Sequence, residues 1–109
     1  RQEGKVRCVF SILRDKNITD TTKQFIDYVD EWYISELNTN RACKTKEIIS
    51  KLTEQRKNVI IKPFKTTQEA FSAAYINSTV NDNIMAFGSF FIVSEILEDT
   101  SICQIQKTQ

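Results

Sequence analysis

Histidine is absent from this 109-residue chain, and cysteine, glycine and proline are scarce. Without histidine the usual general base is missing, so a Ser-His or Cys-His nucleophile is excluded within the chain. The three cysteines, Cys8, Cys43 and Cys103, form no Cys-x-x-Cys pair and leave a zinc site almost without ligands. We therefore expect no metal site and no catalytic residue here, and we expect buried or incidental thiols in a reducing cytoplasm.

The chain also has neither a large excess of charge of one sign nor long hydrophobic runs. Fifteen Lys and Arg against fourteen Asp and Glu give a net charge of +1, whereas a general nucleic-acid binder usually shows a basic excess. No apolar stretch approaches the ~18 residues that span a bilayer, and no signal peptide is visible. We expect neither nucleic acid nor a membrane as a partner, and Trp32 and Tyr33 are expected in the core.

Short apolar segments alternate with amphipathic ones, and together they predict one small domain. Strands are predicted at 6–13, 31–37, 58–64 and 84–87, with a short edge strand at 102–105. Helices are predicted from a cap at Thr19, from Thr45, from the Thr66–Glu69 capping box, and over 90–97. This order predicts an α/β fold: a three-layer, Rossmann-like open sheet with mostly parallel strands.

Each of the first two predicted helices has an apolar face. The inward residues expected are Thr22, Phe25, Ile26 and Val29 in the first helix, and Ile48, Ile49 and Leu52 in the second. Lys46, Lys51, Glu54 and Arg56 are expected to point outward.

Ligands of such sheets bind at the carboxyl ends of the strands. Arg14, Asp15 and Lys16 follow the first strand, and Arg41 follows the second on a polar loop. An arginine there could grip a carboxylate through two hydrogen bonds. The alternatives are a solvated loop and a plain surface arginine.

Gly88-Ser89 joins the last predicted strand directly to a helix. Such a junction exposes the first helical N–H groups to an anion, Gly88 permits close approach, and Ser89 can cap the helix or donate to a carboxylate. The alternative is a turn and a cap without a ligand. Together these strand ends favour an anionic ligand, but no glycine-rich loop is present to cradle a polyphosphate unaided.

Four stretches resemble, in order, motifs of the bifunctional dihydrofolate synthase/folylpolyglutamate synthase family. They are Val9-Phe-Ser-Ile-Leu-Arg-Asp-Lys-Asn-Ile18, Val29-Asp-Glu-Trp-Tyr-Ile34, Asn40-Arg41-Ala42 and Phe87-Gly-Ser-Phe-Phe-Ile-Val-Ser-Glu-Ile96. The resemblance extends from about Val6 to Glu98. The chain departs from the family pattern at Asn17, where Asp is usual, and at Asn40, where Pro is usual.

These synthases belong to the Mur ligase superfamily, and the chain resembles only the Rossmann-like carboxy-terminal domain. The resemblance implies that residues 1–109 form this glutamate ligase domain without its first strand and helix. The central ATPase domain, with its phosphate-binding loop, is absent. The missing initiator Met fits a piece of something larger.

The family's activity is therefore an expectation. ATP, with magnesium, would activate a carboxylate of dihydropteroate or a folate as an acyl phosphate, which the amino group of L-glutamate attacks. The domain would close on the central ATPase domain and position glutamate. The resemblance assigns Ser89, Gly88 and Arg41 to glutamate, and Asp15 and Lys16 to the side facing the nucleotide and acyl phosphate. The isolated chain would be inactive and bind no cofactor.

Two other functions are compatible with the same fold. A stand-alone flavodoxin-like or receiver-like binding module is one, although a receiver needs an acidic cluster and Asp15 has no acidic neighbour in the sequence. A purely structural or oligomerisation domain is the other. An unpaired sheet position could recruit a second copy, so a homodimer is a further hypothesis.

Overall fold

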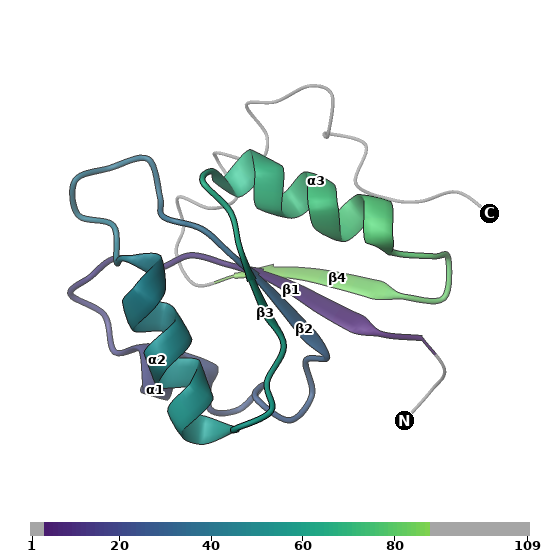
Figure 1. Ribbon diagram of the computed structural model, residues 1–109, viewed down its shortest axis with the longest axis horizontal. Helices are drawn as coiled ribbons and strands as arrows, with labels where there is room; N and C mark the ends of the chain where they lie inside the picture. Colours follow the sequence, from purple (N-terminus) through teal and green to yellow (C-terminus); the bar gives the residue numbers. More distant parts are fainter. Residues whose placement is uncertain (1–3, 88–109) are drawn as a thin grey trace.

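The computed structural model describes residues 4–87, which form four strands and three helices (Figure 1). The strands are β1 (Val6–Phe10), β2 (Glu31–Ile34), β3 (Ile61–Pro63) and β4 (Asn83–Phe87). The helices are α1 (Ile18–Thr22), α2 (Thr45–Gln55) and α3 (Thr67–Asn77). The helix predicted at 90–97 and the strand predicted at 102–105 lie outside the described residues.

The four strands form one parallel sheet in the order β3-β2-β1-β4. Helices α1 and α2 lie on one face of the sheet and α3 on the other (Figure 1). The predicted three-layer α/β architecture is therefore confirmed. The chain first adds strands on one side of β1 and then crosses through α3 to the other side, so the strand order reverses between β1 and β4. Open α/β sheets bind their ligands at such a reversal.

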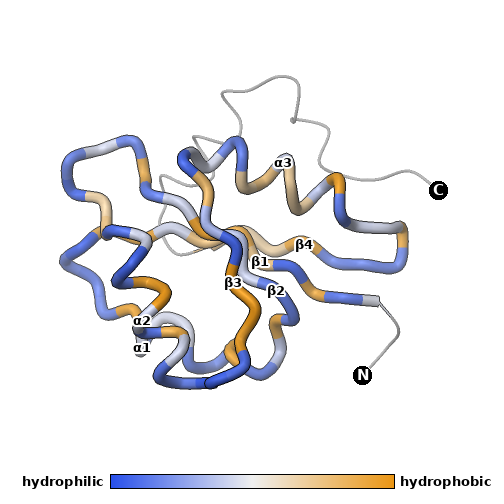
Figure 2. The backbone as a smooth tube through the Cα atoms, viewed as in Figure 1, coloured by the Kyte–Doolittle hydropathy of each residue, from blue (hydrophilic) through white to orange (hydrophobic). Residues whose placement is uncertain are grey.

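The core consists of two layers that the alternation of the strands separates. Cys8, Phe10 and Trp32 pack toward α1 and α2, whereas Val9 and Tyr33 pack toward α3. All five side chains have an exposed fraction of 0%, so the predicted burial of Trp32 and Tyr33 is confirmed. The central strands β1 and β2 are buried along their whole length, as expected where helices cover both faces of a parallel sheet, whereas the edge strands β3 and β4 are only partly buried. Figure 2 shows alternating hydrophobic and hydrophilic stretches along α2, as expected of a helix with one buried side.

Helix α1 differs from its prediction in both its start and its length. Asn17, not Thr19, is the cap: its side-chain oxygen accepts a hydrogen bond from the Asp20 N–H at 2.9 Å. The helix ends at Thr22, and hydrogen-bonded turns continue the chain toward β2. Thr22, Ile26 and Val29 are nevertheless buried, and Phe25 packs against the same core. The inward face was predicted correctly, whereas a continuous helix over it was wrong.

Arg56 also differs from its prediction, because its side chain points inward. Its Nη1 donates to the carbonyl oxygens of Ile26 at 3.2 Å and Val29 at 3.4 Å. These carbonyls belong to the turns after α1, which form no continuous helical ladder. The arginine therefore ties the end of α2 to the segment that precedes β2.

Candidate functional site

The carboxyl ends of β1 and β2 continue into two loops that are joined to each other. Leu13 and Ala42 form an isolated antiparallel bridge. The Cys43 N–H donates to the Ile12 carbonyl at 2.9 Å, and the Arg14 N–H donates to the Arg41 carbonyl at 2.8 Å. The predicted site residues of the two loops are thus held at one edge of the sheet, next to the reversal between β1 and β4.

Asp15 and Arg41 come together across these loops. The Asp15 Oδ2 lies 3.6 Å from Arg41 Nη2, and the two side chains are 59% and 56% exposed. An exposed ion pair of this kind contributes only about 0–1 kcal/mol, so either partner can exchange it for a ligand at little cost. Arg41 is therefore available to a carboxylate that arrives from solvent.

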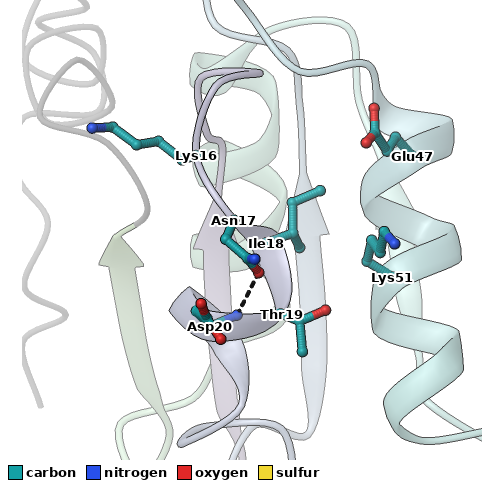
Figure 3. Close-up of a pocket in the computed structure, with 7 residues that line it drawn as sticks. All are labelled: Lys16, Asn17, Ile18, Thr19, Asp20, Glu47 and Lys51. Atoms are coloured by element: carbon teal, nitrogen blue, oxygen red, sulfur yellow. Dashed lines mark hydrogen bonds between the residues drawn. The ribbon is translucent and has the colours of Figure 1, made fainter.

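Lys16 and Asn17 line a pocket of about 370 Å³ between the start of α1 and the face of α2. Its other lining residues are Ile18, Thr19, Asp20, Glu47 and Lys51. Figure 3 shows the Lys16 side chain pointing away from Glu47 and Lys51, whereas Asn17 turns inward to cap Asp20. Asn17 therefore has a local structural role, and the Lys16 ammonium extends from the rim.

A buried chain of hydroxyl groups lies beneath this edge on the α3 side of the sheet. The Ser11 hydroxyl donates to the Ser35 carbonyl at 2.8 Å and lies 2.8 Å from the Ser35 hydroxyl. The Ser35 hydroxyl in turn lies 3.2 Å from Thr67 Oγ1, at the first turn of α3. All three residues are 0% exposed. The prediction missed them, although polar residues at alternating positions after two apolar strands were a usable signal. They fix the strand ends against α3.

Cys8 and Cys43 are free thiols and both are buried, as predicted. Burial, followed by the charge of Glu47, raises the pKa of Cys43 to about 11, and burial raises that of Cys8 well above its ordinary value. Neither is set up as a nucleophile. In the described part of the chain no group of three or more His, Cys, Asp or Glu residues could hold a metal ion. Over the same residues, no helix is long and apolar enough to cross a membrane.

Gly88 and Ser89, the strongest prediction at this edge, lie outside the described residues. Phe87, which precedes them, pairs in register with Phe10 at the end of β1. The described part of the chain therefore ends beside the carboxyl end of β1. The glutamate-binding assignment of Gly88 and Ser89 stays a prediction.

Comparisons with known proteins point to one family. No protein-family model matches the chain. A dihydrofolate synthase/folylpolyglutamate synthase of Buchnera aphidicola is 33% identical over 95 residues, which cover 87% of this chain and 22% of that protein. The structure of E. coli FolC in complex with DHPP and ADP matches 95% of this chain and 24% of its own, with a TM-score of 0.81 and 25% identity. The chain is homologous to one segment of these synthases.

The chain spans only about a fifth of the length of the curated synthases it matches. A further structural neighbour is a bifunctional folylpolyglutamate synthase/dihydrofolate synthase with Mn, AMPPNP and L-glutamate bound; it matches 87% of this chain and 22% of its own, with a TM-score of 0.73 and 28% identity. These matches confirm the resemblance found in the sequence. They do not fit the alternative of a stand-alone flavodoxin-like or receiver-like module.

Proposed function

We propose that the chain is the carboxy-terminal domain of an ATP-dependent ligase that adds L-glutamate to dihydropteroate and folates. The observation that carries this proposal is the similarity to dihydrofolate synthase/folylpolyglutamate synthases over 87% of the chain. The geometry of the site supports the same proposal, because Arg41 and Asp15 meet at the edge where a parallel sheet binds its ligands. The free, buried thiols support the assignment of a reducing compartment such as the cytoplasm.

The role of this domain in the reaction is to bind and orient. Arg41 would hold one carboxylate of the incoming glutamate, and Ser89, with Gly88, the other. Exchange of Asp15 for the substrate carboxylate would leave Arg41 with a charge-assisted hydrogen bond of better geometry than its 3.6 Å contact. A glutamate held in this way presents its amino group from a fixed direction, which makes the attack effectively unimolecular.

Lys16 and Asp15 would face the nucleotide and the acyl phosphate. The Lys16 ammonium would favour the negative charge that develops as the amide forms and phosphate leaves. ATP supplies the phosphoryl group that activates the acceptor carboxylate. The residues that the structure describes do not fit a magnesium site, so we assign the metal to the central ATPase domain and derive no step from it.

The decisive experiment is steady-state kinetics of the synthase polypeptide that contains this chain. Arg41→Ala should raise the KM for glutamate by about tenfold or more, because a hydrogen bond to a charged group contributes about 1.5–3 kcal/mol. The KM for ATP should stay unchanged. Lys57→Ala is the matched control, since it removes the same charge from an exposed position before β3, at the opposite end of the sheet.

Two outcomes would contradict the proposal. An unchanged glutamate KM in Arg41→Ala would remove Arg41 from the substrate site. Folate-dependent ATP hydrolysis by the 109-residue chain alone would contradict its assignment as a domain that depends on a separate ATPase centre.

A further inference from the structure

Arg14 makes two hydrogen bonds to the loop that carries Arg41. Its backbone N–H donates to the Arg41 carbonyl at 2.8 Å, and its side-chain Nη1 donates to the Asn40 carbonyl at 2.7 Å. The distances are short, and the second bond has a charged donor. One residue at the end of β1 therefore binds two consecutive carbonyl groups of the neighbouring loop.

These two carbonyls belong to the peptide units on either side of the Arg41 Cα atom. Because a peptide unit is planar, fixing both carbonyls restricts both backbone dihedral angles of Arg41. The direction of the Cα–Cβ bond of Arg41 is then restricted as well. Arg14 is in this way suited to aim the Arg41 side chain without touching its guanidinium group.

Two further hydrogen bonds of this loop are internal to it. Thr39 Oγ1 accepts from the Arg41 N–H at 3.3 Å, and the Thr39 carbonyl accepts from the Ala42 N–H at 3.1 Å. These bonds shape the turn but do not attach it to the sheet. The backbone bond of Arg14 and the Leu13–Ala42 bridge provide an attachment that any residue type could make. The bond from the Arg14 side chain to Asn40 is the one that depends on the residue at position 14.

We propose that Arg14 is a positioning residue for glutamate: it holds both peptide units around Arg41 so that this arginine is aimed at the substrate carboxylate. The inference rests on the proposed function, because it needs Arg41 to contact glutamate. In this proposal Arg14 affects the affinity for glutamate by holding the loop that carries Arg41, and it does not contact the reacting atoms.

The test compares Arg14→Ala and Arg14→Lys with the wild type in the same synthase polypeptide. Arg14→Ala should raise the KM for glutamate by about three- to tenfold, the effect of losing one solvent-exposed hydrogen bond. The kcat and the KM for ATP should stay within twofold. Arg14→Lys keeps a cationic donor and should recover at least part of the affinity. Lys57→Ala again controls for the loss of one positive charge.

A second measurement follows the loop itself. In the same synthase polypeptide, Arg14→Ala should increase amide hydrogen exchange of the N–H groups at positions 14 and 43, which bond across the two loops. Faster exchange with an unchanged glutamate KM would overturn the positioning role, and so would an equal loss of kcat and of affinity for both substrates. An unchanged KM in Arg41→Ala would instead show that the proposed function itself is wrong at this site.

Discussion

Asp82, in the loop between α3 and β4, anchors the amino edge of the sheet. Its carboxylate accepts hydrogen bonds from the Lys5 N–H at 2.8 Å and the Thr79 N–H at 2.9 Å, and its Oδ2 lies 2.7 Å from Arg7 Nη1. The Asp82 and Arg7 side chains are only 9% and 8% exposed. The two backbone hydrogen bonds, and then the Arg7 guanidinium, lower the pKa of Asp82 from its ordinary 3.8 to about 2.

The lowered pKa of Asp82 determines how much its carboxylate contributes to the stability of the fold and how that contribution depends on pH. One pKa unit corresponds to about 1.4 kcal/mol, so the ionised carboxylate contributes about 2 kcal/mol to folding at neutral pH. Because the pKa is lower in the folded state, the contribution is complete above the unfolded pKa near 3.8. It is lost as the pH falls through about 2. Asp82→Asn should therefore lower the free energy of unfolding by about 2 kcal/mol more at pH 7 than near pH 2.

Urea denaturation followed by circular dichroism, at several pH values from 7 to 2, measures this difference. Asp27→Asn is the matched control, because Asp27 is an exposed carboxylate in the turns before β2. Glu31, which also bonds Arg7, is present in both proteins and cancels in the comparison to first order. If Asp82→Asn and the wild type differed by the same amount at pH 7 and pH 2, the electrostatic reasoning would be refuted.

Two further predictions concern Gly4 and the cysteines. Gly4 has a φ of 98°, and a Cβ atom at this position would collide with the Asn81 carbonyl oxygen. Gly4→Ala should therefore destabilise the fold by about 1–3 kcal/mol. Wild-type stability of this variant in the same denaturation assay would contradict the prediction. With a pKa of about 11, roughly one Cys43 thiol in a thousand is ionised at pH 8. In a Cys103→Ser variant, Cys8 and Cys43 should react with a thiol reagent at least about 100-fold more slowly than in urea-unfolded chain, and equal rates would disprove their burial.

Local signals predicted the parts of the fold that local interactions determine. The predicted cap of α3 at Thr66 is confirmed, because Thr66 Oγ1 accepts from the Glu69 N–H at 3.0 Å. The start of α2 at Thr45 is also confirmed. The alternation of apolar strands and amphipathic helices was sufficient for the three-layer parallel sheet, because short strands separated by helical segments can pair in parallel only through crossovers.

The start of α1 needed information that the local sequence lacks. Asn17 and Thr19 are both good capping residues, and they lie two positions apart. Tertiary packing decides between them, because Ile18 is buried in the core at 5% exposure and belongs to the first turn of the helix. At the end of α1, Thr22 Oγ1 donates to the Ile18 carbonyl and accepts from Gln55 of α2, a partner 33 residues away that the local sequence does not specify.

The candidate site was likewise predictable only where local interactions determine it. Asp15 and Arg41 could be predicted to share an edge, because both follow a parallel strand. Their direct contact, and the bond from Arg14 to Asn40, depend on the relative position of two loops 26 residues apart. No spacing or periodicity in the sequence encodes that position, so nothing in the sequence distinguishes Arg14 from the other polar residues after β1.

The pairing of β1 with β4 also determines when the site can exist during synthesis of the chain. Val6 pairs with Asn83, 77 residues later, so β1 lacks a neighbour on one side until β4 has been made. Contacts so distant in sequence slow folding, because a long loop must close before they form. On a ribosome, the loops that carry Arg14 and Arg41 can join before β4 is made, whereas the pairing of β1 with β4 is the last of the described strand pairings to form. Mutations in β4 should therefore act on folding yield as much as on the finished protein.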